Sequence, residues 1–167
     1  LEYPPEIISV NPTTNMIYAA DYDSNTISVL NGTTNKLLDT IFQQNLKSIS
    51  VNPTTNMIYL GIGGYRNTIS VINGTTNTIS DTIELEYPPE IISVNPTTNM
   101  IYAADYDSNT ISVLNGTTNK LLDTIFQQNL KSISVNPTTN MIYLGIGGYR
   151  NTISVINGTT NTISDTI

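Results

Sequence analysis

The chain has no cysteine, no histidine and no tryptophan, and only two of its 167 residues are phenylalanine. Without cysteine it forms no disulfide and has no thiolate nucleophile, and without histidine it has no imidazole base. The usual zinc ligands are missing for the same reason. Most familiar catalytic constellations are therefore excluded, and we expect no catalytic residue, no cofactor and no enzymatic activity.

Positive charge is also scarce. Lys and Arg total 6 against 13 Asp and Glu, so the formal net charge is -7. A surface that binds nucleic acid needs clustered Lys and Arg to neutralise phosphates, so we expect no nucleic-acid partner. The longest nearly uncharged apolar stretch, residues 57–65, is interrupted by three glycines and is much shorter than the roughly 20 residues of a membrane helix, so we expect no membrane insertion. The chain starts at Leu1 with neither an initiator Met nor a signal peptide, from which we expect a processed or engineered segment.

The dominant feature of the sequence is a perfect internal repeat. Residues 1–83 recur as residues 85–167 without a mismatch or a gap. Natural duplications drift, so this identity indicates either a very recent gene event or the deliberate concatenation of one 84-residue unit. We favour concatenation.

Each 84-residue unit contains a second, weaker repeat. The segment SVNPTTNMIY at residues 9–18 recurs at 50–59, and NTISV at 25–29 recurs at 67–71. A period of about 42 residues without helical periodicity is typical of propeller blades. The predicted blades are 1–41, 42–84, 85–125 and 126–167.

Four β-rich runs divide one blade, at residues 7–10, 16–20, 26–30 and 36–41. The turns between them are rich in Asn, Pro, Gly and Thr, as expected of hairpin loops. Parts of the strands are apolar on both faces, which suits a sheet packed between two neighbours. The sequence therefore predicts an all-β fold, a β-propeller made of four-stranded antiparallel blades with the first strand of each blade innermost.

The motifs SVNPTTNMIY, NTISV and NGTTN resemble the YVTN family of β-propeller repeats, over all four blades. The tetrapeptide that names the family is replaced by IYAA at residues 17–20 and by IYLG at 58–61, so the resemblance rests on the flanking motifs. It implies a surface-layer type of origin, extracellular or at the cell surface, a ring of about seven or eight blades, and interaction rather than catalysis.

Four blades in a row leave two apolar faces uncovered, because a single blade cannot bury its own faces. Our preferred expectation is a head-to-tail homodimer that closes an eight-bladed ring, so the partner is a second copy of the chain. The alternative is a four-bladed monomer, in which the angle between blades rises from about 45° to about 90°.

The two blade types differ mainly in the loops that are expected at one face of the propeller, and loops often carry function on rigid scaffolds. Aromatic and Arg side chains are frequent binding anchors. The ligand-face candidates are Tyr3, Tyr22, Tyr65, Arg66, Tyr87, Tyr106, Tyr149 and Arg150. A protein or glycan ligand on this face, as in a natural cell-surface recognition module, is the alternative to a structural, self-assembling scaffold.

Other candidate sites are weaker. The spacing D-x-D-x-N opens many calcium loops, but the glycine and the final glutamate of the EF-hand are absent. The calcium candidates are Asp21, Asp23, Asn25, Asp105, Asp107 and Asn109. Paired carboxylates for glycoside hydrolysis would have to come from Glu2, Glu6, Asp21 and Asp23. The glycine-rich segment at residues 61–64 lacks the Lys of a P-loop and is interpreted as a tight turn or a close backbone approach.

Two sets of recurring residues have structural and functional interpretations. Tyr18, Tyr59, Tyr102 and Tyr143 share one strand position and are expected in the core, with their hydroxyls hydrogen-bonded. Asn31, Asn73, Asn115 and Asn157 each begin Asn-Gly-Thr, which is both a turn and a glycosylation acceptor sequence.

Overall fold

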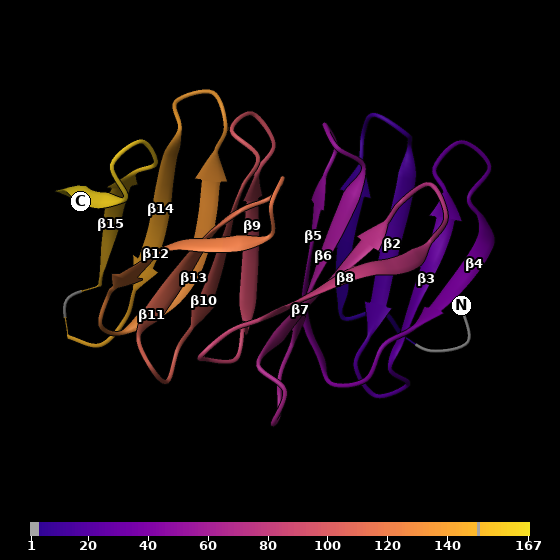
Figure 1. Cartoon of the computed structure of the whole chain (residues 1–167), viewed down its shortest axis with the longest axis horizontal. Coiled ribbons are helices and arrows are strands. Elements are labelled where there is room, and N and C mark those ends of the chain that lie inside the picture. The colour runs from indigo at the N-terminus through magenta and orange to yellow at the C-terminus, as the bar shows by residue number, and fades with distance from the viewer. Residues whose placement is uncertain (1–3, 150) are drawn as a thin grey trace.

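The computed structural model describes residues 4–149 and 151–167, and it consists of four antiparallel sheets of four strands each (Figure 1). We call the sheets blades 1 to 4 in chain order. The strands are β1 (Ile7–Asn11), β2 (Met16–Asp21), β3 (Thr26–Asn31), β4 (Lys36–Phe42), β5 (Leu46–Asn52), β6 (Met57–Ile62), β7 (Thr68–Asn73), β8 (Thr78–Glu84), β9 (Ile91–Asn95), β10 (Met100–Asp105), β11 (Thr110–Asn115), β12 (Lys120–Phe126), β13 (Leu130–Asn136), β14 (Met141–Ile146), β15 (Thr152–Asn157) and β16 (Thr162–Thr166).

Each blade is a meander in which consecutive strands pair, as in the order β1-β2-β3-β4. The first strands of successive blades adjoin one another, β1 with β5, β5 with β9 and β9 with β13, so these strands are innermost. The all-β fold of four-stranded blades is therefore confirmed. Strands β1 to β4 each extend one residue beyond the predicted run, so Phe42, which the repeat boundaries assign to blade 2, is the last residue of blade 1.

Asparagine shapes the turns. Fourteen asparagines have positive φ angles between 45° and 58°, a left-handed conformation that Asn adopts more readily than other residues with side chains. In the first hairpin, the Asn11 carboxamide oxygen accepts hydrogen bonds from the backbone N–H of Thr13 and Thr14, and Asn15 then reverses the chain. In the motif Asn-Pro-Thr-Thr-Asn, the first asparagine thus closes the turn by hydrogen bonds and the second supplies the left-handed residue.

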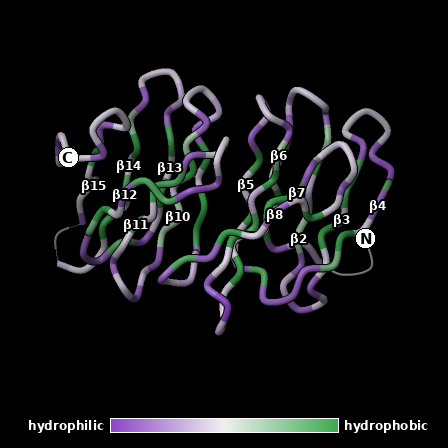
Figure 2. The backbone as a smooth tube through the Cα atoms, viewed as in Figure 1, coloured by the Kyte–Doolittle hydropathy of each residue, from purple (hydrophilic) through white to green (hydrophobic). Residues whose placement is uncertain are grey.

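The hydrophobic core is divided into three layers, one between each pair of neighbouring blades, and Figure 2 shows the hydrophobic residues concentrated along the strands. Tyr143 is only half-buried, because no blade lies beyond blade 4, but Tyr18, Tyr59 and Tyr102 are completely buried, as predicted. The prediction for their hydroxyls is wrong for two of them. The Tyr59 hydroxyl lies 3.5 Å from the Gly116 carbonyl oxygen, whereas those of Tyr18 and Tyr102 are buried without a hydrogen-bond partner. The sheet packing that buries the ring leaves no acceptor beside these two hydroxyls.

The contribution of a left-handed turn residue to stability can be tested at Asn45, whose φ angle is 57° and whose side chain is exposed. We expect Asn45→Ala to lower the free energy of unfolding by about 1 kcal/mol, because a Cβ is disfavoured in this conformation. Asn45→Gly should cost less, because glycine adopts positive φ freely. Urea denaturation of the two variants measures the difference, and equal stabilities would contradict the assigned role of the turn.

Candidate functional site: the two end faces of the arc

The four blades form an open arc, with the two chain ends at opposite ends of the row (Figure 1). The face of blade 1 that points away from blade 2 is here called the leading face. Ile8 on this face is 60% exposed, whereas Ile92, the same residue of the repeat in blade 3, is 6% exposed. Val10 and Val94 differ in the same way. Since the sequences are identical, the difference arises only because blade 3 has a neighbour on this side and blade 1 has none.

The opposite end of the arc, the trailing face, is the side of blade 4 that points away from blade 3. Ile153 on this face is 43% exposed, whereas Ile69, its counterpart in blade 2, is completely buried. Polar residues follow the same pattern, since Ser132 is exposed and its counterpart Ser48 is buried. The blades therefore do not close into a four-bladed ring, and both end faces present core residues to solvent.

The junction between blades 2 and 3 shows what covers such faces. Its hydrophobic layer consists of Tyr59, Ile69, Val71, Ile83, Ile92, Val94, Ile101, Ala103 and Leu114, with Met57 and Leu85 packed against it. The trailing face of blade 4 carries the same residues as blade 2, and the leading face of blade 1 carries the same residues as blade 3. The two end faces are thus the two halves of a junction that already exists inside the chain.

Hydrogen bonds also cross the junction between blades 2 and 3. The Asn52 Nδ2 donates to Asn99 Oδ1 at 2.7 Å, and the backbone N–H of Ile92 donates to the Ser48 hydroxyl at 2.9 Å. Near the outer strands, Asn119 Nδ2 donates to Asp81 Oδ2 at 2.6 Å. These contacts fix how far one blade is shifted against the next, because a buried polar group without a partner is costly.

The junction between blades 2 and 3 also brings two backbone segments close together at Gly61. A Cβ atom at this position would collide with the carbonyl oxygen of Pro89, which belongs to the segment leading into blade 3. The interpretation of this glycine-rich segment as a close approach and a turn is confirmed, since Gly64 also has a φ angle of 75°. Gly61 therefore allows the segment that precedes blade 3 to lie against blade 2.

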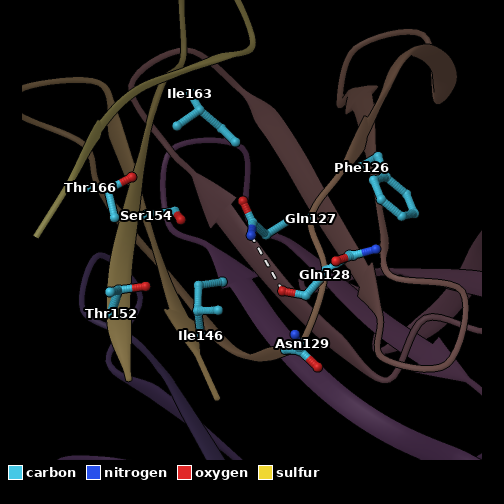
Figure 3. A pocket seen from close by; sticks show the side chains of 9 residues that line it. All are labelled: Phe126, Gln127, Gln128, Asn129, Ile146, Thr152, Ser154, Ile163 and Thr166. Carbon is cyan, nitrogen blue, oxygen red and sulfur yellow. Dashed lines mark hydrogen bonds between the residues drawn. The ribbon is translucent and has the colours of Figure 1, made fainter. Parts of the chain in front are cut away.

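The junctions between blades 1 and 2 and between blades 3 and 4 are copies of each other, and a cavity recurs at both. One copy, of about 490 Å³, lies between blades 3 and 4 (Figure 3), and another, of about 370 Å³, lies between blades 1 and 2. Six repeat positions line both copies: Gln43 and Gln127, Ile62 and Ile146, Thr68 and Thr152, Ser70 and Ser154, Ile79 and Ile163, and Thr82 and Thr166. Arg66 and Glu84 are the only charged side chains lining either cavity in the described residues.

The predicted ligand-face residues have different environments. Tyr65 and Tyr149 are fully exposed, and Tyr87 is partly exposed. Tyr22 and Tyr106 instead pack against the core layers, and the Tyr22 hydroxyl donates to the Lys47 carbonyl oxygen at 2.8 Å. Arg66 lines the smaller cavity, while Tyr3 and Arg150 lie outside the described residues. Tyr22 and Tyr106 are thus partly buried in the packing between blades, whereas Tyr65 and Tyr149 are exposed.

The carboxylates of the loops are engaged in turns. Asp21 Oδ1 accepts from the backbone N–H of Ser24, and the Asp105 carboxylate accepts from the backbone N–H of Asp107 and Ser108. Asn25 Oδ1 accepts from the backbone N–H of Asn45. Glu6 accepts from the backbone N–H of Tyr22, and Glu2 lies outside the described residues. Within the described part of the chain, no three acidic residues gather where they would hold a metal ion.

The Asn-Gly-Thr sequences form turns. In all four of them, the asparagine carboxamide oxygen accepts the backbone N–H of the threonine two residues later; the asparagines are Asn31, Asn73, Asn115 and Asn157. The residues that sequence reasoning missed are Ser48 and Asn52 with their counterparts Ser132 and Asn136. For Asn52 the available signal was its recurrence at the end of the inner strand of every blade, as Asn11, Asn52, Asn95 and Asn136.

Comparison with known proteins agrees on the fold. No family model matches the chain, and no curated protein matches it. Among solved structures, a chain of Kuenenia stuttgartiensis hydrazine synthase is similar with a TM-score of 0.85 at 13% sequence identity, over 97% of this chain and 48% of that one. The protein is thus of the β-propeller type in its blade architecture, and it spans about half the length of this structural neighbour. The described residues contain no helix that would cross a membrane.

The buried tyrosines predict how stability depends on pH. Burial raises the pKa of Tyr59 to about 12 and also raises the pKa values of Tyr18 and Tyr102. Between pH 10 and 12 the unfolded chain therefore loses phenolic protons that the folded chain keeps, so the free energy of unfolding should fall as pH rises. Tyr59→Phe should reduce that fall. Urea denaturation between pH 9 and 12 measures the free energy of unfolding of both proteins. An equally steep fall with pH in Tyr59→Phe would contradict the role of Tyr59.

Proposed function

We propose that this chain is a structural, self-assembling scaffold, half of a propeller that closes into an eight-bladed ring by pairing head to tail with a second copy. The trailing face of each copy covers the leading face of the other, which gives two equivalent contacts related by a two-fold axis. The ancestor that the sequence motifs suggest is a cell-surface propeller of the YVTN type.

The observation that carries the proposal is the contrast between identical residues at different places. Ile92 and Ile69 are buried at the junction of blades 2 and 3, while their copies Ile8 and Ile153 are exposed at the ends of the arc. Burying a large aliphatic side chain stabilises a protein by roughly 1.5–3 kcal/mol. Because the complementary surface is present on every copy, association needs no other protein.

The solution mass is the direct test. We expect light scattering to give about twice 18.2 kDa across a dilution series, with dissociation only at low concentration. A monomer at every concentration would contradict the proposal, and so would a stable species of three or more copies, because eight blades need two chains.

Substitution of Ile8 tests the interface. Ile8→Glu places a charge on the leading face, where the second copy would bury it without a partner. The substitution acts at both contacts of the ring, so we expect the dissociation constant to rise at least about a hundredfold while the circular dichroism of the chain is preserved. Sedimentation velocity of the variant at several concentrations measures this change.

A matched control is available on the outer strand β4, where Leu38 is exposed to a similar degree, 57% against 60% for Ile8. Leu38→Glu should leave the dissociation constant unchanged, because Leu122, its counterpart in blade 3, stays 56% exposed although blade 3 has a neighbour on each side. Equal weakening by both substitutions would indicate non-specific association through exposed apolar side chains.

A further inference from the structure

One row of asparagine contacts crosses every junction inside the chain. The last residue of an inner strand donates through its Nδ2 to the Oδ1 of a turn asparagine in the next blade. The pairs are Asn11 to Asn56 at 2.8 Å, Asn52 to Asn99 at 2.7 Å, and Asn95 to Asn140 at 2.8 Å. All three donors are completely buried and their acceptors are partly buried, so each contact is a hydrogen bond between two amides that is largely shielded from water.

The donor side is held in a fixed orientation by its own turn. Asn52 Oδ1 accepts from the backbone N–H of Thr54 and Thr55, so only Nδ2 remains to reach across the junction. Asn136, the fourth member of the series, has the same bonds to Thr138 at 3.0 Å and Thr139 at 3.3 Å. It is only half-buried, because no blade follows it. The trailing face therefore presents an oriented donor.

The acceptor side is also prepared. Asn15, the counterpart of Asn99, donates through its Nδ2 to the Thr33 hydroxyl at 2.9 Å, as Asn99 does to Thr117 at 3.1 Å. This bond leaves Asn15 Oδ1 as the acceptor that corresponds to Asn99 Oδ1. Asn15 lies on the side of blade 1 that has no neighbour in the arc.

We propose that Asn136 donates to Asn15 of the second copy, and that this pair determines which surfaces associate and in what alignment. The inference rests on the proposed ring and assigns the polar contact that makes it specific. Two trailing faces in contact would oppose two oriented donors and bury them without acceptors, which costs about 1–3 kcal/mol per group. A single buried asparagine pair determines register and partner in coiled coils by the same principle.

Aspartate at both positions gives the test. Asn136→Asp keeps the turn, because a carboxylate also accepts from the N–H groups of Thr138 and Thr139. Asn15 then turns its amide so that Nδ2 donates to this carboxylate and the Thr33 hydroxyl donates to Oδ1. Asn15→Asp tolerates the positive φ angle and still accepts from Asn136. Each single variant should therefore dimerise within about tenfold of the unchanged chain, about 1.4 kcal/mol.

The double variant Asn136→Asp with Asn15→Asp opposes two carboxylates at both contacts of the ring. Like charges facing one another across an interface cost several kcal/mol. We expect its dissociation constant to rise more than about a hundredfold, although positions 136 and 15 lie at opposite ends of one arc. At a concentration low enough for the unchanged chain to be monomeric, the two should have the same melting temperature, because association no longer adds to stability there. Sedimentation velocity over a dilution series, with thermal denaturation of each variant, measures both quantities.

The control is the same pair of substitutions inside the chain, Asn52→Asp with Asn99→Asp, which should lower the melting temperature because the repulsion then acts between blades 2 and 3. A double end-face variant that dimerises as tightly as the unchanged chain would overturn the Asn136–Asn15 assignment while leaving the ring intact. Loss of the dimer in one single variant would overturn it as well. A monomeric unchanged chain would instead overturn the proposed ring, and the pair with it.

Discussion

The structure depends on one constraint, that a blade with two apolar faces needs a neighbour on each. A strand such as β7 directs Ile69 toward blade 3 and Ile72 toward blade 1, so alternate residues of one strand belong to different hydrophobic layers. No blade has a core of its own. Every layer is shared between two blades, which is why stability in such an array resides in nearest-neighbour contacts and why the terminal faces differ from all others.

Asparagine links local geometry to that packing. At positive φ it reverses the chain in the hairpin loops, and through its carboxamide it closes the same loops and bonds to the next blade. One residue type thus sets both the shape of a blade and its alignment against a neighbour. Asn56 and Asn99 show the two properties together, since each has a positive φ angle and accepts the hydrogen bond that crosses a junction.

Repetition gives junctions of one type similar hydrophobic layers, and it also produces recurring loops and cavities that resemble functional sites. The paired cavities near Gln43 and Gln127 recur because their lining residues recur, and the D-x-D-x-N segments are turns whose carboxylates accept backbone N–H groups. By contrast, the end faces expose Ile8 and Ile153, whose counterparts Ile92 and Ile69 are buried inside the chain. Since the sequences are identical, this difference in exposure comes from the missing neighbour, and it identifies the end faces as the candidate site.

The sequence by itself determined the four blades, their four strands and the turns between them, because a period of 42 residues, alternating apolar residues and Asn-rich loops are local properties of the chain. The burial of Tyr18, Tyr59 and Tyr102 was predictable for the same reason. Only the tertiary structure decided that Tyr22 packs between blades, that the Tyr18 hydroxyl has no partner, and that Ile8 is exposed while Ile92 is not. These facts depend on what lies across a junction, and identical sequences cannot encode a difference in their surroundings.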